Sequence, residues 1–201
     1  MPPFAVTYDY LCPFAKNIHL HLVAGLRAGA DWDVTFVPWS LHQAHRDEGA
    51  PDVWDDPAYD DRLLALCASV SVRDNQPDLF LASHEALFVA RHEAGRRLAS
   101  REDVDEALAP LGVDLAAVHE DVASRRPHKL LGEAHRDYER YEAFGVPTFV
   151  LGDDASDGTF VRYMVAPSGD DAASIGVIDS IVSLMTLDPD LNEFKHTRVP
   201  A

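Results

Sequence analysis

The sequence is poor in cysteine, because its 201 residues include only Cys12 and Cys67, which do not form a C-x-x-C pair. A small secreted protein held together by disulfides would carry more cysteines, so we treat each of these two as an individual thiol. For the same reason we expect no structural zinc site with thiolate ligands. Ten histidines are present, but they form no H-E-x-x-H motif, so we expect no metal.

Long apolar runs and positive charge are also scarce. No stretch approaches about eighteen consecutive apolar residues, which excludes a transmembrane helix. The first residues, 1–4, lack the basic and apolar regions of a signal peptide, so we expect a cytoplasmic protein. The chain has 17 basic and 34 acidic side chains, a formal charge of −17. Because this field repels phosphate backbones and anionic lipids, we expect no nucleic-acid or membrane partner and interpret the charge as a solubilising surface.

The first forty residues have the pattern of a strand, a helix and a second strand. Residues 4–8 form a short apolar run typical of a buried strand, and residues 14–28 have helical apolar spacing. Pro13 stands in the first turn of that helix, where a proline is tolerated. Residues 33–37 predict the second strand, which completes a βαβ unit with a right-handed crossover.

Helical patterns dominate the middle of the chain, after a polar stretch at 42–57. The expected features are an apolar stripe of Phe80, Leu81, His84, Leu87, Phe88 and Gly95, a capping box at Ser100 and Asp103, a helix end at Gly112, a cap at Asp114, and a helix over 127–143 that stops at Gly145. These signals predict a block made of helices alone.

Strand patterns return near the end. Residues 147–151 and 160–165 predict a hairpin, and residues 170–185 predict a last helix. This order is the thioredoxin arrangement with helices inserted in its middle. We therefore expect an α/β protein with a thioredoxin fold and an all-α insertion domain. The expected bounds are 1–50 and 128–188 for the thioredoxin-like domain, 51–127 for the inserted helical domain, and 189–201 for an irregular tail.

Cys12 is the main candidate for chemistry, because it lies between the first strand and the first helix. Unpaired backbone N–H groups and the helix dipole favour an anion there, so we expect a lowered thiol pKa and a reactive thiolate. The alternative is a small buried residue that fills the corner between strand and helix.

The segment 145–149 carries the second candidate feature. Pro147 follows a helix stop and precedes a strand, a setting in which an X–Pro bond is often cis. A cis bond would turn the backbone of Val146 outward to pair with an extended ligand. An ordinary trans proline at the first residue of a strand is the alternative.

Three segments together resemble one family. Residues 8–15 (YDYLCPFA) are similar to the active-site segment of the DsbA-like thioredoxin superfamily, residues 85–96 to its inserted helix, and residues 144–150 (FGVPTFV) to its cis-proline loop. The resemblance covers roughly residues 4–186. It is nearest to the subgroup that includes kappa-class glutathione transferases, 2-hydroxychromene-2-carboxylate isomerases and mycothiol-dependent nitroreductases.

The resemblance implies roles for particular residues. Cys12 matches the nucleophile, and the residues that match the thiol-binding positions are Pro13, Phe14, Val146, Pro147 and Thr148. Ala15 departs from the pattern, because it stands where a dithiol oxidoreductase carries its resolving cysteine. Cys12 therefore cannot close an internal disulfide across the motif.

Three functions follow as hypotheses. The first is a thiol-dependent oxidoreductase in which Cys12 works with a low-molecular-weight thiol, mycothiol or glutathione, or with another thiol or disulfide substrate. The second is a thiol-cofactor transferase or isomerase that acts on a small electrophile, and the third is a non-catalytic binding module. The family resemblance also makes a homodimer plausible. Cys67 lies in an apolar helical segment, where a packed core cysteine is favoured over a distant resolving thiol.

Four residues are candidates for a small-molecule pocket: Lys16, Trp39, His84 and His92. Lys16 follows Cys12 by four positions and could pair with a thiolate or with a carboxylate of a thiol cofactor; the alternative is a solvated surface lysine. Trp39, like Trp54 and Phe14, is a candidate pocket wall, with core packing as the alternative. His84 lies on the apolar stripe, so a satisfied core histidine is its default interpretation.

Overall fold

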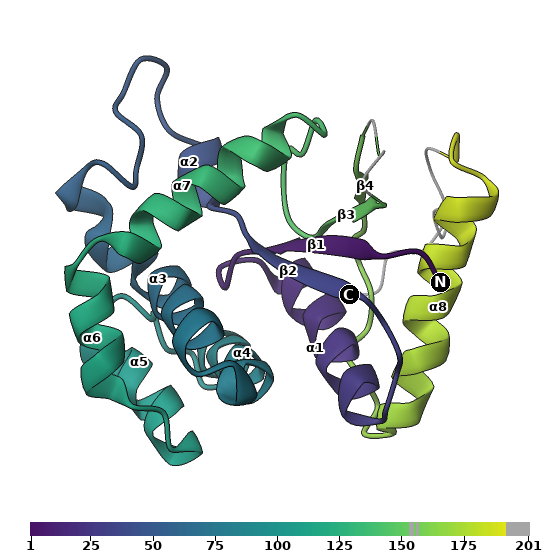
Figure 1. Cartoon of the computed structure of the whole chain (residues 1–201), viewed down its shortest axis with the longest axis horizontal. Coiled ribbons are helices and arrows are strands. Elements are labelled where there is room, and N and C mark those ends of the chain that lie inside the picture. The colour runs from purple at the N-terminus through teal and green to yellow at the C-terminus, as the bar shows by residue number, and fades with distance from the viewer. Residues whose placement is uncertain (153–154, 156, 192–201) are drawn as a thin grey trace.

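A computed structural model of the chain describes residues 1–152, 155 and 157–191. Its centre is a four-stranded sheet in the order β2-β1-β3-β4 (Figure 1). The strands are β1 (Phe4–Tyr8), β2 (Val34–Pro38), β3 (Thr148–Leu151) and β4 (Thr159–Phe160). β1 runs parallel to β2 and antiparallel to β3, with Phe4 opposite both Val34 and Leu151, and β4 is antiparallel to β3. A mixed α/β fold with this sheet confirms the predicted fold class.

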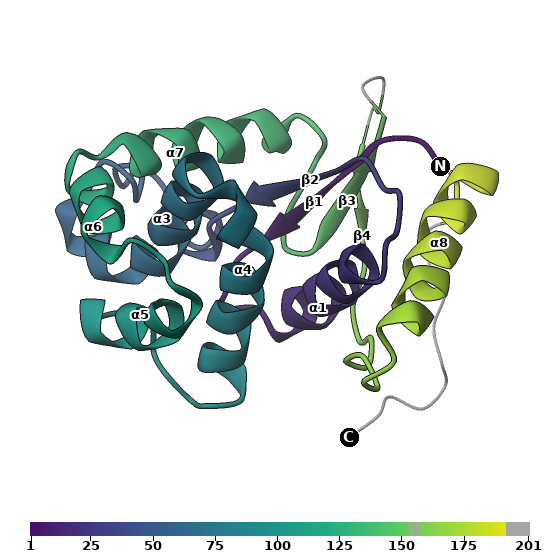
Figure 2. The ribbon, with the colours of Figure 1, turned by 60° about the horizontal axis from the view of Figure 1, so that its bottom comes forward.

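Helices cover both sides of the sheet (Figures 1 and 2). On one side α1 (Pro13–Arg27) packs against α8 (Asp171–Leu187), and on the other α7 (Arg126–Glu139) crosses the strands. Alternate residues of β1 point to opposite faces, so Val6 joins the core with Ile18 of α1, whereas Ala5 joins a smaller cluster with Tyr141 after α7. The sheet therefore has two buried faces.

Between β2 and α7 the chain is helical, as predicted. The elements are α2 (Leu41–Ala44), a 3₁₀ turn (Pro57–Tyr59), α3 (Asp60–Asn75), α4 (Pro77–His92), α5 (Arg101–Leu108), a second 3₁₀ turn (Ala109–Leu111) and α6 (Leu115–Ala123). Short α2 lies inside the polar stretch in which no helix was expected. α7 begins at Arg126 and so spans the expected domain boundary, which stays a prediction. None of the helices in these described segments is long and apolar enough to span a membrane.

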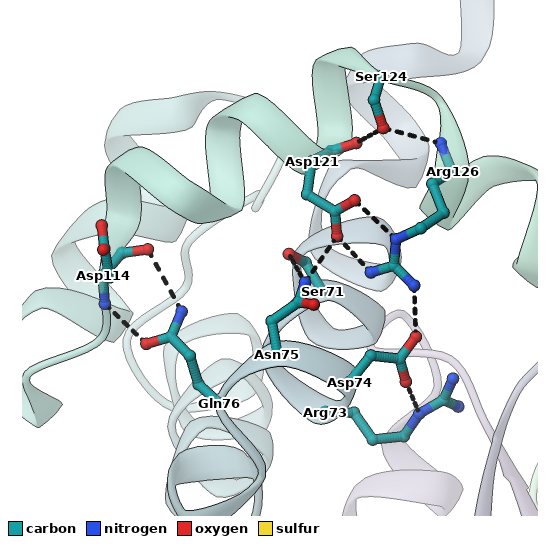
Figure 3. A network of polar contacts seen from close by, with 9 residues as sticks. All are labelled: Ser71, Arg73, Asp74, Asn75, Gln76, Asp114, Asp121, Ser124 and Arg126. Atoms are coloured by element: carbon teal, nitrogen blue, oxygen red, sulfur yellow. Dashed lines mark hydrogen bonds and ion pairs between the residues drawn. The ribbon is translucent and has the colours of Figure 1, made fainter.

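The predicted helix ends are confirmed by their capping bonds. Ser100 accepts the N–H of Asp103, Asp114 accepts the N–H of Ala117, and Gly112 adopts the left-handed conformation. Hydrogen bonds and ion pairs between side chains then join the helices to one another (Figure 3).

Arg126 is central to these contacts, because its guanidinium pairs with Asp121 of α6 and, at 2.6 Å, with Asp74 of α3 (Figure 3). Gln76 exchanges two hydrogen bonds with the backbone of Asp114. These contacts fix α3, α6 and α7 relative to one another.

Two predicted elements are too long. α7 ends at Glu139 rather than at 143, and the positive φ of 54° at Glu142 shows that helical geometry does not continue to the predicted end. The strand predicted over 160–165 is only Thr159–Phe160. Beyond it the chain leaves the sheet for α1, where the carbonyls of Met164 and Val165 bond to Asn17 and His21.

Two smaller predictions concern the end of α4 and the C-terminal part of the chain. Gly95 lies beyond the last residue of α4, His92, and so does not extend the apolar stripe. The last helix is confirmed as α8. Most of the predicted irregular tail, 192–201, lies outside the described residues.

Candidate active site

The turn at residues 9–12 places Cys12 at the start of α1. The N–H of Cys12 donates to the carbonyl oxygen of Asp9 at 3.0 Å, which closes the turn. Cys12 is the N-cap residue, with extended backbone angles, and Pro13 occupies the first helical position. The Cys12 Sγ accepts the N–H of Ala15 at 3.4 Å. The sulfur therefore takes the place that a serine or aspartate oxygen holds in other helix caps.

The 145–148 loop lies against this sulfur. The Val146–Pro147 peptide bond is cis, and the Cys12 thiol donates to the Val146 carbonyl oxygen at 3.1 Å. Two threonines hold the loop: Thr148 Oγ1 donates to the Gly145 carbonyl at 2.9 Å, and the N–H of Thr148 donates to Thr7 Oγ1 at 2.8 Å. The structure thus brings Cys12, Val146, Pro147 and Thr148 into one place.

Burial controls the state of the Cys12 thiol. The residue is 7% exposed, and this burial raises the pKa of the Cys12 thiol, with a smaller contribution in the same direction from Asp9. The N–H groups of Ala15 and Phe14 act in the opposite direction. The expectation of a lowered pKa was wrong, because it counted the helix terminus and not the loss of water around the sulfur. Burial therefore favours the protonated form of the Cys12 thiol.

Asp9 is a buried carboxylate that the sequence analysis did not single out. It is 3% exposed, and its two oxygens accept the N–H groups of Leu11 at 2.9 Å and Leu41 at 2.8 Å. Burial raises its pKa to about 6, opposed by those two bonds and by Arg91. The signal in the sequence that could have identified this buried carboxylate was an acidic residue inside an apolar run, three positions before the cysteine.

Helix α4 holds the turn from the side of the inserted helices. His84 Nδ1 lies 2.8 Å from the hydroxyl of Tyr10, and His92 Nε2 lies 2.8 Å from the Tyr10 carbonyl, to which it must donate. His84 also bonds to His19 of α1 at 3.0 Å, and His19 donates to the Thr7 carbonyl at 3.1 Å. Burial lowers the pKa of His19 to about 4, so this histidine is neutral. Tyr10, two residues before Cys12, is therefore fixed through both its side chain and its backbone.

The structure places the four pocket candidates in different environments. His84 is fully buried and hydrogen-bonded, which confirms the core interpretation. Trp39 is 1% exposed and stacks on His135 with ring centroids 4.3 Å apart, so it is part of the core and not a pocket wall. Lys16 pairs with Glu93 at 3.1 Å rather than with the sulfur. His92 is half-buried beside the active-site turn.

An aromatic surface adjoins the start of α1. The Phe14 ring lies 4.8 Å from that of Tyr163, and Phe160 lies 5.1 Å from Phe144, which is 70% exposed. The guanidinium of Arg162 lies over both Phe160 and Tyr163, and no carboxylate within the described part of the chain forms an ion pair with it. The Phe14 ring, two positions after Cys12, thus contacts an aromatic group that also carries the Arg162 cation.

Cys67 has no exposed surface and lies in the core, as expected for a packed cysteine. Burial raises its thiol pKa, which makes it unreactive. Within the described residues, no three His, Cys, Asp or Glu side chains are grouped as metal ligands.

Comparison with known proteins gives a family and a fold. The family model described as "DSBA-like thioredoxin domain" matches residues 62–165, which is more than half of the chain. No curated protein matches the sequence.

Several solved structures share the fold at low sequence identity. The MdbA thiol-disulfide oxidoreductase of Actinomyces oris has a TM-score of 0.62 and 17% identity over 90% of this chain and 79% of its own. The cytosolic disulfide reductase DsbM of Pseudomonas aeruginosa, solved with GSH, has a TM-score of 0.60 and 18% identity over 90% and 100%. NmDsbA1 of N. meningitidis has a TM-score of 0.58 and 14% identity over 94% and 86%.

Proposed function

The chain belongs to the DsbA-like thioredoxin family, and from that premise we propose that it is a thiol–disulfide oxidoreductase that works through one cysteine, Cys12. The observation that carries this proposal is the position of the Cys12 sulfur, between the N–H of Ala15 and the carbonyl of Val146. A sulfur at a helix start that faces such a loop has backbone N–H groups that can bond to its thiolate form and a backbone carbonyl beside which a substrate can lie.

We infer that the Val146 carbonyl takes part in activation of the thiol. At rest it accepts the Cys12 S–H, which keeps the proton on sulfur. A substrate that lies along the loop in an extended conformation would donate its own N–H to this carbonyl. The sulfur would then lose its acceptor and keep the N–H donors of Ala15 and Phe14, which lower its pKa against the opposing effects of burial and Asp9. Binding of substrate and formation of the nucleophile are coupled in this way.

The chemistry is an exchange in two steps. The Cys12 thiolate attacks one sulfur of a disulfide R–S–S–R′, forms Cys12–S–S–R and releases R′S⁻, which takes up a proton. A second thiol, R″SH, loses its proton, attacks the R sulfur, forms R–S–S–R″ and returns the Cys12 thiolate. The electrons balance within the exchanging thiols and disulfides, so no other oxidant is needed.

The second thiol has to come from solution, because Ala15 is where a resolving cysteine would stand and Cys67 is sealed in the core. We assign this role to a low-molecular-weight thiol, glutathione or mycothiol. The aromatic surface with Arg162 supports the choice, since it offers apolar contact at Phe14 and a cation over the Tyr163 ring that packs against it. DsbM, a neighbour in fold, is described as cytosolic and was solved with GSH, which is in keeping with a cytoplasmic role here.

The proposal is tested by turnover. The native protein is supplied with a small mixed disulfide and with reduced glutathione or mycothiol, and formation of the symmetric disulfide is followed. We expect turnover with at least one thiol, none with Cys12→Ser, and full turnover with Cys67→Ser. If Cys12→Ser keeps the activity, the proposal fails. If the native protein consumes a thiol and a small electrophile without forming a disulfide, the transferase or isomerase hypothesis replaces it.

A further inference from the structure

A hollow of about 480 Å³ lies at the junction of α6 and α7, where the loop before α3 meets the start of α7. Its walls are Trp54, Asp55, Ser124, Arg125, Arg126, His128, Lys129 and Arg136. None of these residues belongs to the Cys12 site. Four of the eight carry a positive charge and one a negative charge, in a chain with twice as many acidic as basic side chains.

Two of the cations are held in fixed orientations. Arg125 forms two bonds to the Asp60 carboxylate, at 2.8 and 3.0 Å, and Arg126 pairs with Asp121 and Asp74 (Figure 3). These carboxylates offset much of the charge on the two guanidinium groups. Their ordered geometry shapes the wall of the hollow but leaves little charge for a ligand.

The other two cations have longer ion pairs than Arg125 and Arg126 have. Lys129 is 77% exposed, and its nearest carboxylate is Glu133 at 3.7 Å. Arg136 lies over the Trp54 ring and is 3.5 Å from Asp52, at the limit of a hydrogen bond. Asp55 is the one carboxylate among the residues that line the hollow, and the carboxylates of Asp52 and Glu133 lie at its edge beside these two cations.

The buried His128 side chain is a second observation that indicates a ligand, and it does not depend on the charges of the wall. It is 3% exposed, and neither of its ring nitrogens has a hydrogen-bond partner in the described part of the protein. The nearest acid is Asp60, 3.5 Å from Nε2, which is already engaged by Arg125. A buried imidazole without a hydrogen-bond partner is destabilising, so native proteins supply a partner. A ligand that accepts a hydrogen bond would satisfy it.

We propose that this hollow binds the phosphate group of a small phosphorylated molecule. Phosphate accepts several hydrogen bonds, which suits the N–H of His128 together with the side chains of Lys129 and Arg136. α7 also directs its positive end toward the hollow, which favours an anion. The hollow has the volume of a small-molecule site, so an organic portion fits beside the phosphate.

The test is a titration of the full chain with two probes, inorganic phosphate and glycerol phosphate, at ionic strength matched with sodium chloride. Binding is measured by calorimetry, and the His128 ring resonances are followed by NMR. We expect saturable binding, shifted His128 signals, and tighter binding of the ester than of inorganic phosphate. Lys129→Gln is expected to weaken binding about tenfold through loss of a charge-assisted bond.

Arg101→Gln is the matched control, because Arg101 is an exposed cation on α5 outside the hollow. It should bind like the native chain, as should Cys12→Ser, which separates this site from the proposed thiol chemistry. No saturable binding would overturn the proposal. Equal weakening by Lys129→Gln and Arg101→Gln would also overturn it, because the effect would then be that of net charge alone. Tighter binding of inorganic phosphate than of glycerol phosphate would contradict the inference that the ligand carries an organic portion beside its phosphate.

Discussion

The Cys12 thiol donates to the carbonyl oxygen of Val146 at 3.1 Å, across 134 positions of sequence. The same sulfur accepts the N–H of Ala15 at 3.4 Å. One neighbour thus favours the protonated sulfur and the other favours the thiolate. Under the proposed function, a substrate that bonds to the Val146 carbonyl would remove the first of these two influences.

Ala15→Cys should restore a second thiol. Ala15 is fully buried, one helical turn after Cys12, so the new sulfur costs about 1–3 kcal/mol of overpacking. We expect an internal disulfide between positions 12 and 15 and a gain of insulin-reducing activity. Thiol counts under oxidising conditions and an insulin turbidity assay measure these outcomes. Ala15→Ser is the control, and the same activity in both variants would contradict the resolving-cysteine account.

Asp9→Asn should lower the pKa of the Cys12 thiol. The Asp9 carboxylate raises that pKa through its negative charge, so its removal favours the thiolate. The measurement is the rate of Cys12 alkylation by iodoacetamide against pH, in a Cys67→Ser background. An unchanged or higher pKa in the variant would show that Asp9 does not act on the sulfur.

Asp9 should also make stability depend on pH. Its native pKa is about 6, against an ordinary value of 3.8, so between these values the folded state binds more protons than the unfolded state. Stability therefore falls as pH rises from 4 to 6, by up to about 3 kcal/mol for this group. Urea unfolding of the native protein and of Asp9→Asn isolates the effect, because the other titrating groups cancel. If the free energy of unfolding changed with pH in the same way in both proteins, the effect assigned to Asp9 would be refuted.

His92→Leu should loosen the active-site turn. His92 donates to the Tyr10 carbonyl at 2.8 Å, and loss of this bond costs about 1 kcal/mol. Because the turn shields the sulfur, we expect alkylation of Cys12 to become about fivefold faster. His92→Gln keeps a donor at a similar position and should restore the native rate. A failure of the glutamine variant to restore the rate would assign His92 a packing role only.

Local signals in the sequence were enough to place the main parts of the site. Pro13 marked the start of α1 and so put Cys12 at its cap, and Pro147 with Gly145 marked the loop before β3. The capping residues Ser100 and Asp114 likewise defined helices of the insertion. Each of these features depends on a few neighbouring residues.

The errors concern properties that depend on distant contacts. The burial of Cys12 and Asp9 follows from packing against Val146 and Leu41, which no local pattern shows. The end of β4 depends on α1, where Asn17 bonds to a carbonyl of the expected strand. The hydrogen bonds of His84 join segments more than sixty positions apart. Sequence periodicity assigned His84 to the core but did not identify its partners.

The reactivity of Cys12 toward a disulfide tests the central proposal most directly. The native protein is incubated with oxidised glutathione or with oxidised mycothiol, and the modified site is mapped by mass spectrometry after digestion. We predict one thiol adduct, on Cys12, which reduced thiol removes, and no adduct on Cys12→Ser. An adduct on Cys67, or an unmodified Cys12 in a folded protein with either disulfide, would contradict the account.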